Sequence, residues 1–193
     1  MLSSEKTGFS YLPFQLKETY FDHHSHLHGI NHTYRVMFHV LNIGRLAGLN
    51  HEIKLAFCAA FIHDMARRHD GYCLEHGVWA TNSKFPLFRK LFLETGVKIE
   101  GLRAIKLAVS NHSIRHEIRK EHPFSTTVAL LKDADALDRI RIGESNLKPE
   151  YLRFPESHGL IDFAKELYHR SKDEVLGSFE EVIEIGNSLG KIR

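Results

Sequence analysis

The sequence predicts a single all-α domain, and three observations support this prediction. Apolar residues recur at spacings of three and four over most of the chain, and no stretch shows the sustained alternation of a strand. Glycine and proline are sparse, at 13 and 5 of 193 residues, and no linker rich in Ser, Gly or Pro divides the chain. A hydrophobic content of 42% over 193 residues suits one domain with a full core. We therefore expect one helical bundle over residues 1–193.

The first two helices are expected on either side of Gly48. Asn31 is a candidate N-cap for the first helix, which Gly48 would stop. Asn50 is expected to cap the second helix, which runs toward the Asp70-Gly71 turn. Their apolar faces are Val36, Val40, Ile43 and Ala47 in the first helix and Leu55, Ala59 and Ile62 in the second.

The remaining helices follow from the same periodicity. We expect a short helix over residues 74–83, carrying Val78 and Trp79 as its apolar face. Pro86 at a first turn then opens a helix with the stripe Leu87, Leu91 and Phe92. Further stripes predict helices around residues 102–109 and 125–140. Two amphipathic helices, roughly 160–172 and 179–189, end the chain and either cover the bundle or form a homodimer surface; their apolar residues are Phe163, Leu167, Phe179, Val182 and Ile185.

Composition excludes several classes of partner. The 26 Lys and Arg residues nearly balance 24 Asp and Glu, so a nucleic acid or an anionic membrane is not an expected partner. No apolar run reaches about 18 residues, the length of a membrane-spanning helix. Residues 1–8 lack the basic-then-apolar pattern of a signal peptide. With only Cys58 and Cys73, which we expect on the core side, a disulfide framework is excluded and a cytoplasmic location is expected.

The 15 histidines are more than packing requires, and several lie on apolar helix faces. His32 lies four residues before Val36, and His63 lies four after Ala59. His112 lies three after Val109, and Asp135 lies four after Leu131. Burying such groups without partners costs roughly 2–7 kcal/mol each. Imidazoles and a carboxylate that converge in a helical bundle are the ligands a divalent transition metal requires.

Asp64 directly follows His63 and is turned about 100° around the helix axis. In the middle of a helix two such neighbours diverge too far to share an ion easily. At the end of a helix, facing an ion between helices, both can reach it. The doublet follows the apolar segment Ala59-Ala-Phe-Ile, which places it at such an end.

The ordered set His32, His63-Asp64 and Asp135 resembles the HD superfamily of metal-dependent phosphohydrolases. The flanking segments His28-Gly-Ile-Asn-His32, Phe61-Ile-His-Asp-Met and Leu131-Lys-Asp-Ala-Asp135 match as well. His76 and His112 look like the two extra histidines of members that hold two metals. The resemblance spans about residues 28–143, and residues 144–193 would complete the bundle.

The resemblance implies that His32, His63, Asp64 and Asp135 hold a first metal, and that Asp64 bridges to a second ion bound by His76 and His112. One or two divalent ions are implied, with Mn, Fe, Ni, Mg and Zn all compatible with these ligands. Such ions would acidify water for attack on phosphorus. The expected substrate is a small phosphorylated metabolite, with a nucleotide favoured, and Asp64 would be catalytic.

Substrate phosphates also require cations. Arg67, four residues after His63 and so expected on the same helix face, and Arg141, six after Asp135, are the catalytic candidates for that role. Arg35, three residues after His32, has the same potential.

Several alternatives stay open. His39 is a rival to His32, although a backbone-bonded core histidine is the simpler interpretation, and His116 is a rival to His112. Residues 22–28 lead into the first ligand helix or contact metal or substrate. Asp138 is interpreted as a group that orients a ligand. The run 115–120 is a solvated face or a phosphate-facing lid. The alternative functions are an HD-type di-iron oxygenase and a non-catalytic nucleotide-sensing module.

Overall fold

Helices form the whole architecture of residues 9–190, which are the residues that the computed structural model describes, and no strand occurs among them. The all-α prediction is confirmed. Residues 1–8, on which the signal-peptide expectation rests, lie outside the described residues. No helix within residues 9–190 is long and apolar enough to cross a membrane. The α-helices are α1 Ile30–Leu46, α2 Asn50–Ile62, α3 His76–Ser83, α4 Phe85–Glu94, α5 Gly101–Asn111, α6 Ser125–Leu137, α7 Pro155–Gly159, α8 Ile161–Ser171 and α9 Phe179–Ser188.

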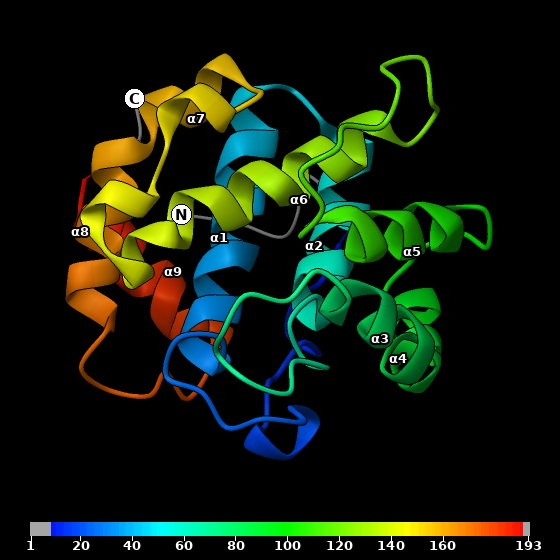
Figure 1. Ribbon diagram of the computed structural model, residues 1–193, viewed down its shortest axis with the longest axis horizontal. Helices are drawn as coiled ribbons and strands as arrows, with labels where there is room; N and C mark the ends of the chain where they lie inside the picture. Colours follow the sequence, from blue (N-terminus) through cyan, green and yellow to red (C-terminus); the bar gives the residue numbers. More distant parts are fainter. Residues whose placement is uncertain (1–8, 191–193) are drawn as a thin grey trace.

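Helices α1 and α2 form the centre of the bundle, and α6 packs against both (Figure 1). Helix α5 packs against α2 and α6 and carries α3 on its other side. Short 3-10 helices connect α6 to α7; they are η3 Asp138–Ile142, η4 Glu144–Asn146 and η5 Pro149–Tyr151. This arrangement brings one end of each of α1, α2, α3, α5 and α6 to a common region.

The core explains the central position of α2. Its residues from Leu55 to Ile62 are all buried, because the helix is apolar on every side. Phe57 makes edge-on contacts with Phe14, at 5.2 Å between ring centroids, and with Phe179 of α9, also at 5.2 Å. One aromatic side chain therefore joins the N-terminal segment and the last helix to the centre.

The two terminal helices cover the bundle. Helix α9 packs on α1 and α8, and its Phe179 and Val182 are fully buried, as is Leu167 of α8. Phe163 of α8 lies against Phe38 of α1, with ring centroids 6.1 Å apart. Most of their apolar surface is thus used within the chain, and a homodimer stays a prediction.

Both expected asparagine caps are wrong. Helix α1 begins one residue earlier than Asn31, with Gly29 as its N-cap, where a Cβ would collide with the carbonyl oxygen of Ser25. The Asn31 amide instead donates to the Ser171 carbonyl at 2.8 Å, and its oxygen accepts from the Leu176 amide at 2.9 Å. It therefore ties the α8–α9 connection to α1. Asn50 is the first residue of α2, and the N-cap position is held by Leu49.

Three other expectations also fail. Leu87 is 71% exposed, because the face of α4 that packs inward carries Phe85 together with the predicted Phe92. Val78 is exposed as well, and α3 packs through Gly77 and Ala80. Cys73 is half-buried outside the core, and both cysteines are free.

His39 is fully buried, yet neither ring nitrogen has a hydrogen-bond partner among the described residues. The expected bond to backbone is absent. Burial lowers the pKa of His39 to about 4, so the ring is neutral near pH 7. His39 therefore acts as a packing residue of α1.

Candidate metal centre

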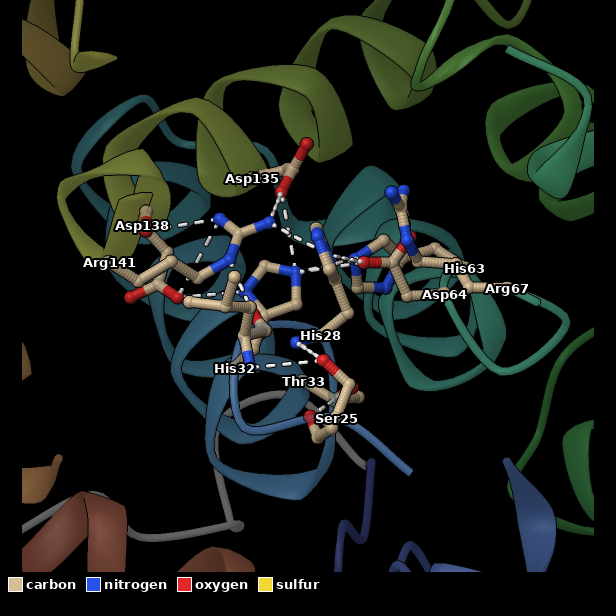
Figure 2. A network of polar contacts seen from close by, with 12 residues as sticks. Ser25, His28, His32, Thr33, His63, Asp64, Arg67, Asp135, Asp138 and Arg141 are labelled. Carbon is tan, nitrogen blue, oxygen red and sulfur yellow. Dashed lines mark hydrogen bonds and ion pairs between the residues drawn. The ribbon is translucent and has the colours of Figure 1, made fainter. Parts of the chain in front are cut away.

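The predicted metal ligands lie at the ends of five helices. His32 lies in the first turn of α1, and His63 and Asp64 follow the last residue of α2. The remaining three lie at the start of α3, directly after α5 and in the last turn of α6. The structure thus brings all six predicted metal ligands together: His32, His63, Asp64, His76, His112 and Asp135. Figure 2 shows the part of this cluster around His32 and Asp64.

The first group of donors surrounds the Nε2 atom of His32. The Nε2 atom of His63 lies 3.1 Å away, Oδ1 of Asp135 lies 3.4 Å away and Oδ2 of Asp64 lies 3.3 Å away. A divalent transition metal with bonds of about 2.0–2.2 Å holds its ligand atoms roughly 3–3.5 Å apart. The spacing of these donors therefore fits one ion.

The second group lies on the other side of Asp64. Its Oδ1 atom is 3.0 Å from His76 Nε2 and 3.5 Å from His112 Nε2, and the two imidazole nitrogens are 2.8 Å apart. Oδ2 of the same carboxylate faces His32 and His63. The two oxygens of Asp64 thus face different pairs of histidines.

Four histidines are oriented by acceptors behind them. Each ring donates its Nδ1–H to an oxygen, which leaves the lone pair on Nε2 facing the centre. At 2.8 and 3.1 Å, two such lone pairs repel unless a positive charge lies between them. The oxygens are the carbonyls of Ala60 for His63 (2.6 Å), Val109 for His112 (2.7 Å) and Cys73 for His76 (2.9 Å), and the Asp138 carboxylate for His32 (2.7 Å).

Asp138 holds both His32 and Arg35. The Arg35 guanidinium donates to its two oxygens at 2.6 and 3.1 Å, and all three side chains are buried. Burial alone would raise the pKa of Asp138, but the adjacent Arg35 and the bond from His32 hold it well below its usual range. The interpretation of Asp138 as an orienting group fits these contacts. Arg35 cannot reach a substrate phosphate, so that expectation is wrong.

The two other acids are also kept ionised. Burial opposes ionisation of Asp135, but Arg141 and the nearby imidazoles lower its pKa to about 2. Burial likewise opposes ionisation of Asp64, and His63 first among its neighbours holds the pKa of Asp64 well below the usual range. Burial lowers the pKa of His63 to about 3, which leaves its ring neutral and able to bind a metal. Oδ1 of Asp135 is buried without a hydrogen-bond partner, as expected of a ligand atom.

His28 also belongs to the cluster. From the sequence it was a candidate only as part of residues 22–28, for which contact with metal or substrate was one of two interpretations. Its Nδ1 atom lies 2.9 Å from Oδ2 of Asp64, and the side chain is buried. The Ser25 hydroxyl accepts the backbone N–H groups of Leu27 and His28, at 3.0 and 2.8 Å, and so fixes the turn before α1. This turn lies before the first helix, so helical periodicity could not predict that His28 faces the cluster.

Arg67 and Arg141 border the cluster from opposite sides. Arg67 does not extend the α2 face, because the chain turns after Ile62. Its guanidinium lies 3.8 Å from Asp64 and donates to the Gly71 carbonyl at 2.8 Å. Arg141 donates to the Leu27 carbonyl at 2.7 Å and lies 3.6 Å from Asp135. Both are largely buried, and each is held partly by backbone.

Gly77 allows α3 to approach α5. A Cβ at this position would collide with the Val109 carbonyl oxygen and lie 3.2 Å from the His112 ring. The glycine therefore permits the contact that sets His76 beside His112.

A cavity of about 590 Å³ lies beside the cluster, and its lining includes His112 and Asp135. Such a volume is typical of small-molecule sites. Most of its other lining residues come from two segments, termed the first and second walls: Ser113, Ile114, Arg115 and Glu117 in the first, and Asn146, Lys148, Glu150, Tyr151, Leu152 and Arg153 in the second. Sequence periodicity gave no indication of the second wall, because it is built from 3-10 turns and loops.

A comparison with protein families agrees with this geometry. The family model described as HD domain matches residues 29–140. The chain belongs to the HD-domain family. The matched range contains all six clustered residues predicted as ligands, whereas His28 and Arg141 lie just outside it. HD domains are typically metal-dependent hydrolases, and the clustered histidines and acids suit a divalent ion. No curated protein and no solved structure matches the chain significantly.

Proposed function

We propose that this HD-domain protein hydrolyses a phosphoester or phosphoanhydride of a small phosphorylated metabolite. The observation that carries the proposal is the position of Asp64. Its two oxygens face two separate pairs of histidines at 3.0 to 3.7 Å, beside a cavity of about 590 Å³. A carboxylate can bridge two ions about 3.5–4 Å apart, which a single imidazole nitrogen cannot do.

In this proposal each side chain has a defined role. His32, His63, Asp135 and one oxygen of Asp64 would hold the first ion; His76, His112 and the other oxygen would hold the second. Bound divalent ions supply Lewis-acid chemistry, because they acidify water and neutralise charge on phosphoryl oxygens. Asp138 holds the His32 ring in the correct tautomer through the 2.7 Å bond to Nδ1.

The arginines at the border would stabilise the phosphoryl group. Arg67 Nε is buried without a hydrogen-bond partner, so it retains a free donor. Arg141 places positive charge 3.6 Å from Asp135. Hydrolysis would add water across the P–O bond, releasing phosphate and the corresponding alcohol or phosphate leaving group.

A nucleotide is the substrate class that we favour. The cavity volume suits a nucleotide, and Tyr151, which is 59% exposed, lines the cavity where it could stack against a base.

Free thiols at Cys58 and Cys73 agree with a reducing, cytoplasmic setting.

The test is phosphate release from a panel of nucleotides and sugar phosphates, with Mn²⁺, Mg²⁺, Ni²⁺ or Fe²⁺ added to metal-free protein. We expect metal-dependent release by the wild type and none by Asp64→Ala, whose helical content should stay nearly unchanged by circular dichroism. Asp162→Ala is the matched control, because that carboxylate on α8 is fully exposed. Wild-type rates in Asp64→Ala would contradict the proposal. Oxygen consumption by iron-loaded protein, without phosphate release, would instead support an oxygenase.

A further inference from the structure

The cavity beside the metal centre, termed the trough, is lined in part by the end of α6 and by the η3 turn that follows it. Its lining includes Lys132, Asp135 and Ala136, which are spaced three and four apart on one face of α6, and Arg139 of η3. Asp135 is a candidate metal ligand and also a lining residue, so the trough adjoins the candidate metal centre.

An ion-pair cluster joins Lys132 of α6 to both walls. Glu117 of the first wall pairs with Lys132 at 3.2 Å and with Arg153 of the second wall at 2.5 Å. Arg153 also pairs with Asp133, at 2.9 Å. The positive charges of Lys132 and Arg153 are therefore already neutralised, and the walls are tied together here.

The other cations that line the trough have no ion pair among residues 9–190. They are Arg115, Arg139 and Lys148, and all three are exposed. Arg139 makes a single bond, from Nε to the Asn146 carbonyl at 3.2 Å, so its terminal nitrogens are free. Three carboxylates line the trough. Asp135 belongs to the candidate metal centre, Glu117 belongs to the ion-pair cluster, and Glu150 is the third. The free charge of the trough is thus positive.

Unpaired cations around a concave site raise the local concentration of anions and bind phosphate by charge-assisted hydrogen bonds. A substrate phosphate at the centre would therefore leave Arg139 and Lys148 available to a different part of the same molecule.

We propose that the trough is a second anion subsite, in which Arg115, Arg139 and Lys148 bind a phosphate remote from the one that is hydrolysed. This inference rests on the proposed function and narrows its substrate to small molecules phosphorylated at two separate positions.

The experiment compares dissociation constants of a nucleoside 5′-monophosphate and the matching 3′,5′-bisphosphate, measured by calorimetry with Mn²⁺. In the wild type we expect the bisphosphate to bind at least about tenfold tighter, as one additional charged contact gives. In Arg139→Ala/Lys148→Ala the ratio of the two constants should fall to near one, and Lys148→Glu alone should lower it as well. Arg103→Ala, an exposed arginine of α5 outside the lining, is the control.

The outcomes separate the two proposals because calorimetry requires no turnover. If the wild-type ratio is near one, or if the variants weaken both ligands equally, the second subsite is refuted even where phosphate release persists. If the ratio falls as expected but the wild type releases no phosphate from either ligand, the subsite stands and the hydrolase proposal fails. Thermal unfolding of each variant verifies that its fold is intact.

Discussion

Asp138 performs two roles that a pair of variants can separate. It balances the buried Arg35 charge with bonds of 2.6 and 3.1 Å, and it orients His32 with a bond of 2.7 Å. Removing one partner of a buried ion pair costs about 3–5 kcal/mol, because the other charge is left without compensation. Asp138→Ala should therefore lose that much of the free energy of unfolding. With a urea slope of about 2 kcal/mol per molar, the midpoint should fall by about 1.5–2.5 M.

The double variant Arg35→Met/Asp138→Leu replaces the pair by apolar groups. Such replacement is often neutral or stabilising, so the urea midpoint should recover most of its loss. The His32 ring would still lack its acceptor, and loss of such a partner typically lowers metal affinity 10–100-fold. Recovered stability with weakened Mn²⁺ binding is thus the expected signature.

Two measurements check this prediction. Urea unfolding of metal-free protein, followed by circular dichroism, gives stability, and calorimetric titration with Mn²⁺ gives affinity. Asp162→Asn, on the exposed face of α8, is the control for both. The reasoning is refuted if Asp138→Ala moves the midpoint by less than about 0.5 M, or if the double variant binds Mn²⁺ as tightly as the wild type.

Three further predictions concern the same centre. His112→Ala should lose about one Mn²⁺ per chain by elemental analysis; an unchanged metal content would contradict two separate binding positions. Gly77→Ala should lower Mn²⁺ content in the same way, because a Cβ there collides with α5; full loading of that variant would show that α3 shifts without harm. Because the pKa of Asp138 is held below its usual range, its contribution to stability is complete above the unfolded value of about 3.9 and is lost as pH falls below it. Urea midpoints of metal-free protein should therefore drop steeply below about pH 4, and Asp138→Asn should flatten that drop.

The sequence was sufficient to predict the helices and the clustered residues for one physical reason. Helical periodicity reports which side chains face the core, and His32, His63, His112 and Asp135 each continue an apolar stripe by one turn. Because helix ends converge in this bundle, residues at those ends meet. The order of the motif then identified His76, whose own helix has no useful apolar face.

Features built from turns and loops could not be predicted in the same way. His28 reaches Asp64 from the turn before α1, and Arg67 lies beyond the end of α2, so neither position follows from helix geometry. The cations Arg139 and Lys148 lie on a 3-10 turn and a loop. The Asn31 cap failed because side-chain bonds to residues about 140 positions away, at 2.6 to 2.9 Å, leave no local signal.

The most direct test of the central claim is anomalous diffraction from a crystal of the protein grown with Mn²⁺. We expect two anomalous peaks, one on each side of the Asp64 carboxylate, the first between His32, His63 and Asp135 and the second between His76 and His112. A single peak would contradict the bridging role of Asp64. No peak beside Asp64 would contradict the metal centre itself.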